Sequence, residues 1–327
     1  MVLPALGVSA RRGRSSRLTA DRVLVTGGAG FIGSFVAERF ARDGFEVRIL
    51  DDLSSGSRAN LRPGWRLLEA DVGDAAAVDA AVAGCRAVVH LAAFTSVPES
   101  FERFEACYRI NVRGTFHVLE ACARHAIPKL AFASSSAVYA ERPDAPKTEA
   151  DCPEPISPYA VSKLEGEHLL DAFGAARGLA SVALRFFNVY GPRQPADSDY
   201  AAAVPIFLQR GLRGETLTVY GDGHQTRDFV FVEDVADAVF RAALAPATGV
   251  FNVGSGEPTE ILTLADEIAK LTGGPPGHRF EPLRPGDVRS STADVARVAA
   301  ALGWHAQTGL ARGLARSLDW YRRELSG

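Results

Sequence analysis

The sequence contains little cysteine and no long apolar run. Its four cysteines form no Cys-x-x-Cys pair and have no histidines at metal-ligand spacing; they are Cys85, Cys107, Cys122 and Cys152. This usage is typical of reduced, mostly buried thiols in a cytoplasmic protein, and it gives no reason to expect a disulfide framework or a bound metal. No apolar run approaches the ~20 residues that a membrane-spanning helix requires, so we expect no membrane segment.

The sequence also lacks a strong excess of either charge. Its 36 lysines and arginines nearly balance 39 aspartates and glutamates, for a formal net charge of −3. Such a balance does not predict binding to nucleic acid or to an anionic membrane. The 327 residues are 47% hydrophobic, enough for one large or two moderate domains. Residues 1–19 carry the basic stretch Arg11-Arg12-Gly13-Arg14 after a short apolar one, the reverse of a secretory signal, and we expect a disordered tail.

From Arg22 onward, short apolar strands alternate with segments that carry apolar residues at helical spacing. The expected strands are 22–26, 46–51, 66–71, 87–91, 129–134 and 181–186. The expected helices are 30–43, 75–83, 98–125 and 159–177. This alternation predicts an α/β fold in which helices cover both faces of a Rossmann-type, doubly wound parallel sheet, and we assign residues 20–185 to that domain.

Beyond Phe186, turn-rich pieces such as 191–195 and 283–287 interrupt the alternation. A helix is expected at 202–213 and a strand at 217–220. The segment 229–253 returns to a strand-helix-strand pattern, and we expect it to rejoin the first sheet. Residues 186–327 are therefore predicted to form a smaller α/β substrate lobe that is partly interleaved with the first domain.

A glycine-rich turn lies between the first expected strand and the first expected helix. Gly27 permits a tight turn, Gly30 lets the backbone approach a pyrophosphate, and Gly33 lets the helix pack closely on the strand. The free N–H groups of the helix N-terminus also favour a phosphate. Asp51 ends the next strand, where a carboxylate can accept the ribose hydroxyls of a dinucleotide. Because Asp51 and Asp52 have no adjacent arginine and would repel a 2′-phosphate, the sequence predicts NAD as the cofactor rather than NADP.

Tyr159 and Lys163 are four positions apart, so an α-helix places both side chains on one face. The Lys163 ammonium and the positive charge of an oxidised nicotinamide both favour a phenolate. They are expected to lower the pKa of Tyr159 toward that of a useful general base. A hydroxyl from the serine run 134–136, at the end of an expected strand, would complete a proton relay. Tyr-x-x-x-Lys is common by itself, and the glycine turn upstream is what favours a catalytic role here.

Together these stretches resemble the extended short-chain dehydrogenase/reductases, and within them the nucleotide-sugar epimerases and dehydratases. The resemblance runs from about Arg22 to the C-terminal helix through matches at 26–33, 50–53, 70–72, 90–93, 111–112, 134–139, 157–159 and 185–192. It implies an NAD molecule that stays bound through the catalytic cycle, and it selects Ser135 as the catalytic hydroxyl beside Tyr159 and Lys163. The other cofactor contacts that it implies are Phe31, Ile32, Asp71, Val72, Leu91, Ala92, Ala93, Asn111 and Phe186.

The resemblance also implies a nucleoside diphosphate sugar in the second lobe. Tyr220 would stack on the base, and Arg227 and Arg284 would bind the phosphates. Asp287 would bind a ribose hydroxyl. A planar guanidinium suits phosphate oxygens, which is the physical reason for arginine at both places. The other implied substrate contacts are Ser135, Ser136, Asn188, Val204 and Ser291.

The expected reaction depends on the residues that follow Ser135. In the dehydratases of this family, Asp-Glu follows the catalytic hydroxyl and eliminates water, whereas this sequence has Ser136 and Ala137, which cannot act as acid or base near neutral pH. A 4-keto sugar without an elimination path can turn and take the hydride back on its other face. The sequence therefore predicts 4-epimerisation of a UDP-sugar or a dTDP-sugar. Ser291 leaves room for a 2-acetamido group, so UDP-glucose/galactose and UDP-N-acetylglucosamine/N-acetylgalactosamine both stay open.

Other functions remain open at this point. Within the family they are a 4-keto-sugar reductase, a dehydratase and a UDP-glucuronate 4-epimerase, the last disfavoured because Asn188 and Pro195 replace a threonine and an arginine of such enzymes. A non-catalytic, NAD-sensing scaffold is the alternative from another class, although it would not need Ser135, Tyr159 and Lys163 together. The apolar stripes of 98–125 and 159–177 resemble the paired helices of family dimers, so we expect a homodimer.

Overall fold

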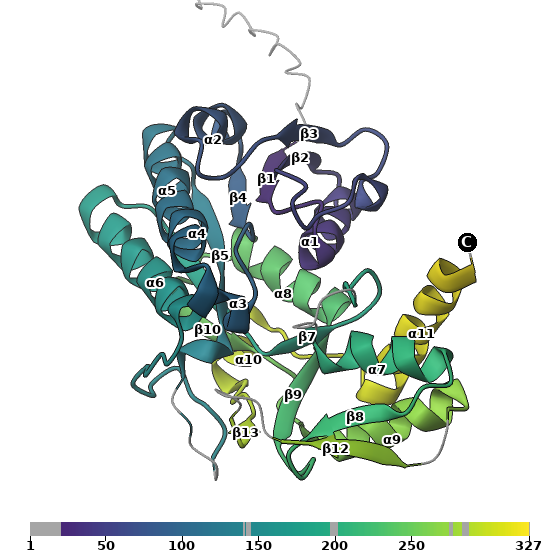
Figure 1. The fold of residues 1–327 in the computed structure, drawn as a ribbon. Helices are drawn as coiled ribbons and strands as arrows, with labels where there is room; N and C mark the ends of the chain where they lie inside the picture. Colours follow the sequence, from purple (N-terminus) through teal and green to yellow (C-terminus); the bar gives the residue numbers. More distant parts are fainter. Residues whose placement is uncertain are drawn as a thin grey trace, which may run out of the picture.

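Seven parallel strands form the central sheet of the protein (Figure 1). A computed structural model describes residues 21–139, 141, 145–196, 202–274, 277–282 and 288–326. The strands are β1 (Arg22–Thr26), β2 (Glu46–Asp51), β3 (Arg66–Glu69), β4 (Ala87–His90), β5 (Lys129–Ser135), β6 (Ser181–Phe186) and β10 (Gly249–Val253). Their order, β10-β6-β5-β4-β1-β2-β3, reverses at β1. This is the doubly wound arrangement of a Rossmann-type sheet, and the predicted fold class is confirmed.

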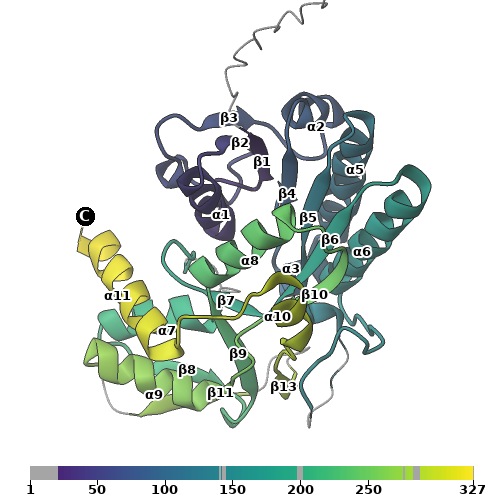
Figure 2. The same cartoon turned by 180° about the vertical axis from the view of Figure 1, so that it is seen from behind.

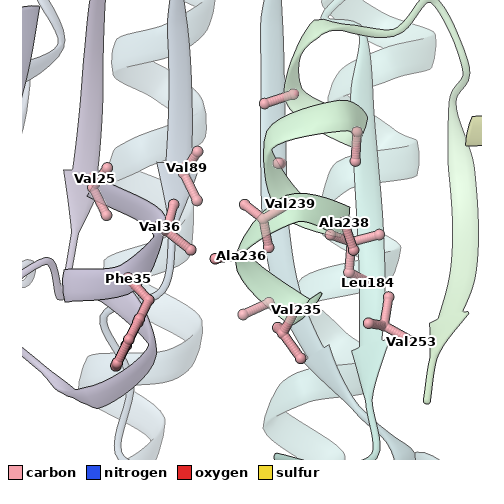
Figure 3. Packing of buried hydrophobic residues seen from close by; sticks show 14 of the residues in the cluster. Val25, Phe35, Val36, Val89, Leu184, Val235, Ala236, Ala238, Val239 and Val253 are labelled. Atoms are coloured by element: carbon pink, nitrogen blue, oxygen red, sulfur yellow. The ribbon is translucent and has the colours of Figure 1, made fainter. Parts of the chain in front are cut away.

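Helices cover both faces of this sheet because its strands are apolar on both sides. Successive side chains of a strand point to opposite faces. Val23 and Val25 of β1 therefore join the apolar cluster of α1 (Phe31–Arg42) and α8 (Val232–Leu244), part of which Figure 3 shows. Leu24, between them, joins the cluster of α2 (Ala75–Val82), α5 (Gly114–Arg124) and α6 (Pro158–Arg177).

The sequence predicts one helix over 98–125, and this prediction is wrong. The segment consists of α3 (Val97–Glu102), α4 (Phe104–Tyr108), a π-helical turn (Arg109–Arg113) and α5. Arg103, at φ −119° and ψ 46°, leaves the helical region between α3 and α4. The π-helical turn inserts an extra residue into the helical path, a feature frequent at functional sites. Apolar spacing cannot reveal such breaks, because each short piece keeps an apolar face.

The smaller lobe has its own sheets and helices (Figure 2). It also has its own apolar core. Its elements are β7 (Asn188–Tyr190), α7 (Ala203–Leu212), β8 (Leu217–Tyr220), β9 (Thr226–Phe231), β11 (Pro258–Glu260), α9 (Ile261–Thr272), β12 (His278–Glu281), β13 (Ser290–Ser291) and α11 (Leu310–Ser326). β9 pairs with β7, β11 and β13, while β8 pairs with β12. Phe207, Leu208 and Leu264 are buried at the centre of its core.

Residues 229–253 divide between the two parts of the molecule. β9 lies in the small sheet, whereas α8 packs against α1 and β10 pairs with β6 at the edge of the large sheet. α10 (Ala296–Leu302) also packs on α8 and β10. Only the helix and the second strand of the expected strand-helix-strand unit therefore reach the large sheet, because its first strand completes the small one.

Three of the predictions concern residues outside the part of the chain that the structure describes. They are the tail at 1–19 and the implied phosphate and ribose contacts Arg284 and Asp287. Within the described ranges, no helix combines the length and the apolar character that crossing a membrane demands.

Candidate active site

The glycine turn lies at the carboxyl end of β1 and forms one wall of the site. Gly27 adopts φ +68°, and a Cβ added there would lie 2.7 Å from Ala92 N. A Cβ at Gly33 would lie 2.0 Å from Gly27 O, so a side chain would push α1 away from the turn. At Gly30, an added Cβ would meet only Gly27 O among the described atoms, at 3.2 Å. The turn is tightly packed on its inner side and open at Gly30, which fits the pyrophosphate of a dinucleotide.

Asp51 ends β2 and holds the turn from the side. Its Oδ2 accepts a hydrogen bond from Ala29 N and its Oδ1 accepts one from Leu53 N, both at 2.9 Å. Burial raises the pKa of the Asp51 carboxyl, against the opposing effect of these two donors. Each carboxylate oxygen has a second lone pair, so Asp51 can hold the turn and still accept ribose hydroxyls. Asp52 is exposed and accepts from Ser54 N and Oγ, at 3.0 and 2.6 Å.

A buried histidine links the glycine turn to α5. Thr26 Oγ1 accepts from Leu91 N and Ala92 N, at 3.2 and 3.1 Å, and lies 2.7 Å from His90 Nδ1. His90 Nε2 lies 3.0 Å from Thr115 Oγ1. Burial lowers the pKa of His90 to about 3, so the ring is neutral at physiological pH. Nothing in the sequence marks this role of His90 beyond its place in the matched stretch 90–93.

Asp71 and Val72 follow β3 at the same edge of the sheet. The Asp71 carboxylate accepts from Gly73 N at 2.7 Å and pairs with Arg109 of the π-helical turn at 2.5 Å. Val72 is buried against Gly114, where an added Cβ would lie 2.6 Å from Val72 Cγ1. The other expected cofactor-lining residues of this edge are all partly buried: Phe31, Ile32, Leu91, Ala92 and Ala93.

Helix α6 brings Tyr159 and Lys163 together beneath the end of β5. Pro158 begins the helix, and the Ser157 side chain accepts from Ala160 N at 3.1 Å, which fixes its first turn. Lys163, only 4% exposed, donates to Ala133 O at 2.9 Å. Its Nζ lies 5.8 Å from the centroid of the Tyr159 ring. The two side chains therefore share the face of α6 that meets the sheet.

The Ser135 hydroxyl, at the end of β5, is hydrogen-bonded to the Tyr159 hydroxyl. Burial raises the pKa of Tyr159, and the Ser135 hydrogen bond opposes this only in part. Lys163 Nζ is directed to the Ala133 carbonyl, and the lowering of the pKa of Tyr159 that Lys163 and an oxidised nicotinamide are expected to cause together stays a prediction. Burial also lowers the pKa of Lys163 to about 8. The charge that Lys163 places beside the Tyr159 ring is therefore lost in mild alkali.

Asn111, in the π-helical turn, ties three segments together. Its Oδ1 accepts from Phe94 N at 2.7 Å, and its Nδ2 donates to Phe94 O at 3.0 Å and to Ser162 Oγ at 2.9 Å. Thr115 Oγ1 donates to Asn111 O at 2.5 Å. Asn111 is 2% exposed, so these contacts are made in a buried environment. They fix the loop after β4 against α6, beside Tyr159.

A buried ion pair lies one helical turn beyond Lys163, and the sequence reasoning missed it. Glu167 of α6 accepts from Arg185 of β6 at 2.9 and 2.7 Å. Ser134 Oγ also donates to Glu167 Oε1, at 2.5 Å. The spacing of four residues from Tyr159 to Lys163 to Glu167 is the one signal that could have shown it. These contacts anchor α6 on the ends of β5 and β6, where the candidate catalytic groups lie.

Asn188, an expected substrate contact, lies at the boundary of the two lobes. Phe186, 8% exposed, ends β6, and the partly buried Asn188 begins β7. Ser136 is partly buried and starts a 3-10 turn with Ala137 directly behind it, whose N–H donates to Ser135 Oγ at 3.2 Å. A carboxylate is thus absent from the two positions that follow Ser135.

The small lobe brings two further candidates together. Arg227 of β9 and Ser291 of β13 are register partners, and each is 9% exposed. Tyr220 ends β8, in the two-stranded sheet that β8 forms with β12. Val204 is 2% exposed and belongs with Leu208 to the apolar core of the lobe, and its contact with a substrate stays a prediction.

The cysteines and other metal-binding side chains show no metal centre in the described part of the chain. No group of three or more histidine, cysteine, aspartate or glutamate side chains is arranged there to hold a metal ion. The four cysteines are unpaired, and three of them are buried.

A model of the NAD dependent epimerase/dehydratase family matches residues 23–254. The chain belongs to this family. NAD is the cofactor of the family, so the cofactor predicted from the glycine turn and Asp51 is confirmed. The match spans the whole large sheet from β1 to β10, together with the first half of the smaller lobe.

Relatives from this epimerase/dehydratase family include enzymes with different named activities. A UDP-glucose 4-epimerase of Mycolicibacterium smegmatis is 39% identical over 317 residues, which cover 93% of this chain and 99% of the relative. A dTDP-glucose 4,6-dehydratase of Streptomyces niveus is 34% identical over 315 residues, which cover 92% of this chain and 93% of the relative.

Solved structures of the family match the chain over nearly its full length. The Thermus thermophilus UDP-glucose 4-epimerase in complex with NAD has a TM-score of 0.86 and 38% identity, with 92% of this chain and 99% of that one covered. The Methanobrevibacter ruminantium UDP-N-acetylglucosamine 4-epimerase, in complex with UDP-N-acetylmuramic acid, has a TM-score of 0.90 and 35% identity, with 94% and 100% covered. The chain is thus similar to epimerases named for two different sugars.

Proposed function

We propose that the protein is a UDP-sugar 4-epimerase. The observation that carries this proposal is the 3-10 turn behind Ser135, which places Ser136 and Ala137 where an eliminating enzyme needs an acid and a base. The hydroxyls of Ser135 and Tyr159 and the buried Lys163 serve oxidation at C4, which every reaction of this branch begins with. The similarity to 4-epimerases that act on nucleotide sugars supports the same choice.

Tyr159 is the general base of the proposed reaction. As a phenolate, Tyr159 takes the proton of the sugar O4, which the Ser135 hydroxyl passes on to it, while the C4 hydride leaves. Lys163 holds its charge beneath the Tyr159 ring and favours this phenolate. When bound at the glycine turn, NAD would supply the acceptor for the C4 hydride and the donor for its return.

The proposed reaction leaves the sugar in its original oxidation state. The 4-keto sugar turns in the pocket, the hydride returns to the opposite face of C4, and Tyr159 gives its proton back to O4. One C–H bond and one O–H bond break and form again, so the product differs from the substrate only in configuration. This balance fits an enzyme that keeps its cofactor throughout the cycle.

Substrate binding is assigned to the small lobe and its boundary. Asn188 at the start of β7 would contact the diphosphate sugar, Arg227 the phosphates and Tyr220 the base. Ser291, the register partner of Arg227, is small and would admit a 2-acetamido group. We therefore propose both UDP-glucose and UDP-N-acetylglucosamine as substrates, with dTDP-sugars as the alternative nucleotide.

The exposed aromatic side chains near α6 support the proposed homodimer. Phe104 and Tyr108 of α4 are 56% and 47% exposed, and Phe116 of α5 is 42% exposed. Large apolar side chains gathered on neighbouring helices mark a protein–protein interface more often than a solvated face. The dimer would pair these helices across a two-fold axis.

We place this enzyme in the cytoplasm, in agreement with its free cysteines.

The proposed reaction can be tested with a panel of UDP- and dTDP-sugars. The purified protein is incubated with each sugar, and the configuration at C4 is determined by NMR. An epimerase forms the 4-epimer and consumes no added NADH, whereas a 4-keto-sugar reductase consumes NADH in proportion to product. Absence of a 4-epimer from both UDP-glucose and UDP-N-acetylglucosamine would refute the proposal.

A further inference from the structure

The turn after β7 contains a residue in an unusual backbone conformation. Arg193 adopts φ +67°, in the left-handed region that residues with a Cβ rarely enter. Such a conformation persists where the surroundings hold it in place, and it is common near functional sites. Arg193 follows Asn188, the proposed sugar contact, by five positions. Its contacts therefore bear on where β7 lies.

The Arg193 side chain is held by three contacts within about one turn of α1. Nη1 donates to Ser34 Oγ at 3.0 Å, and Nη2 donates to Glu38 Oε1 at 2.7 Å. The guanidinium carbon lies 4.4 Å from the centroid of the Phe35 ring. The side chain is 15% exposed, so this ion pair is largely shielded from solvent. A planar guanidinium satisfies all three contacts at once.

The same turn is fixed to the smaller lobe on its other side. Gln194 Nε2 donates to Val189 O at 3.1 Å, and the Tyr321 hydroxyl of α11 donates to Gln194 O. The Tyr190 hydroxyl donates to Leu310 O at 3.3 Å. Arg193 thus joins the helix that begins at the glycine turn to the strand and helix that frame the smaller lobe.

We propose that Arg193 is a positioning residue that sets the place of β7, and with it Asn188, relative to α1 and the cofactor turn. The inference rests on the proposed function, which assigns Asn188 to the nucleotide sugar. α1 directs its N-terminus at the pyrophosphate site, and β7 begins at the sugar site. Tying Arg193 to Ser34, Phe35 and Glu38 fixes the separation of these two sites, on which the approach of C4 to the cofactor depends.

Two readouts separate this role from a purely structural one. UDP binding to the NAD-containing protein is measured by titration calorimetry, and the NAD content is measured after denaturation. We expect Arg193→Ala to weaken UDP binding about tenfold, a modest effect for a displaced contact residue, while the NAD content stays at the wild-type level. With UDP-glucose as substrate, KM should rise and kcat should also fall, because C4 is then less well placed against the cofactor.

Matched variants distinguish the contacts from the backbone strain. Arg193→Gly removes the same side chain but suits the positive φ, so it should melt higher than Arg193→Ala and bind UDP equally weakly. Arg193→Lys keeps the charge near Glu38 and should recover part of the UDP affinity. Arg62→Gln is the control, because Arg62 contacts the same Glu38 Oε1 from within the large domain and should leave both readouts unchanged.

Unchanged UDP affinity and kcat/KM in both Arg193→Ala and Arg193→Gly would overturn the inference. Loss of NAD with UDP affinity retained would also overturn it, since Arg193 would then serve the cofactor helix alone. A wild-type protein that binds UDP but epimerises no sugar contradicts the proposed function instead. In that case the UDP titrations of the variants still decide whether Arg193 positions the nucleotide site.

Discussion

Glu167 and Arg185 form a two-point ion pair between α6 and β6 in which each side chain is only 4% exposed. Replacing Glu167 with glutamine leaves the Arg185 charge buried without its counter-ion. Removing one member of a buried pair typically costs ~3–5 kcal/mol, so we expect Glu167→Gln to lower the free energy of unfolding by about that amount. Urea unfolding at neutral pH measures the change.

The matched control for this prediction is an exposed pair. Arg58 and Glu69 are 64% and 51% exposed, and surface pairs contribute at most about 1 kcal/mol. Arg58→Gln should therefore leave the urea midpoint nearly unchanged. A Glu167→Gln variant as stable as Arg58→Gln would show that water or a neighbouring group compensates the Arg185 charge.

Tyr159→Phe tests the assignment of the general base. The substitution keeps the ring and removes the hydroxyl that is hydrogen-bonded to Ser135, so turnover should fall by ~10²–10⁴-fold. NAD content and thermal stability should stay close to wild type. Tyr108→Phe removes a hydroxyl from an exposed ring of α4 and should leave turnover unaffected. Substantial turnover by Tyr159→Phe would assign proton transfer to another group.

The pKa of Lys163 predicts that kcat declines on the alkaline side of its pH profile. Burial lowers this pKa from 10.5 to about 8, so the ammonium is mostly present at pH 7 and is lost as the pH rises through 8. Because the charge of Lys163 favours the phenolate, we expect kcat to decline above that pH. Lys163→Arg keeps a charge at all accessible pH values, so it should abolish the decline while lowering the maximum rate. The same decline in Lys163→Arg would assign it to a different group.

Ser291→Tyr tests the sugar pocket. Ser291 is 9% exposed beside Arg227, and a tyrosine there would fill the space that a 2-acetamido group needs. We expect turnover of UDP-N-acetylglucosamine to be lost while UDP-glucose is still epimerised, as measured by NMR on both sugars. Equal losses on both sugars would place the acetamido pocket elsewhere.

Phe104 and Phe116 test the proposed dimer. Glutamate at both positions places charges on the exposed aromatic face of α4 and α5, which a dimer interface would bury. Light scattering after gel filtration should show a dimer for the wild type and a monomer for the double variant. Phe280→Glu, at a residue of β12 that is 55% exposed, is the control and should remain dimeric. A wild-type monomer would contradict the proposal directly.

The sheet of the large domain could be predicted from the sequence because its signals are local. Runs such as Val23-Leu24-Val25 are apolar on both faces, and Gly27, Gly30 and Gly33 mark the first turn without reference to the rest of the chain. The spacing of Tyr159 and Lys163 is likewise a property of one helix. These features need no knowledge of which distant segments come into contact.

The features that the sequence did not reveal depend on long-range packing. Glu167 meets Arg185 only because α6 lies across β6, and the π-helical turn at Asn111 is held by Phe94 and Ser162 from other segments. Sequence spacing placed Lys163 beside the Tyr159 ring. It could not show that burial raises the pKa of the phenol or that Lys163 Nζ donates to the Ala133 carbonyl, because both depend on how α6 packs against β5.

The late position of β10 in the chain has a consequence during synthesis. Six strands of the large sheet are complete at residue 186, but β10, the outer partner of β6, is not present until residue 253 has left the ribosome. Until then β6 presents an open row of N–H and C=O groups, the kind of edge on which chains aggregate. A nascent chain that stalls within the smaller lobe therefore exposes this edge, and folding protection is needed most during that interval.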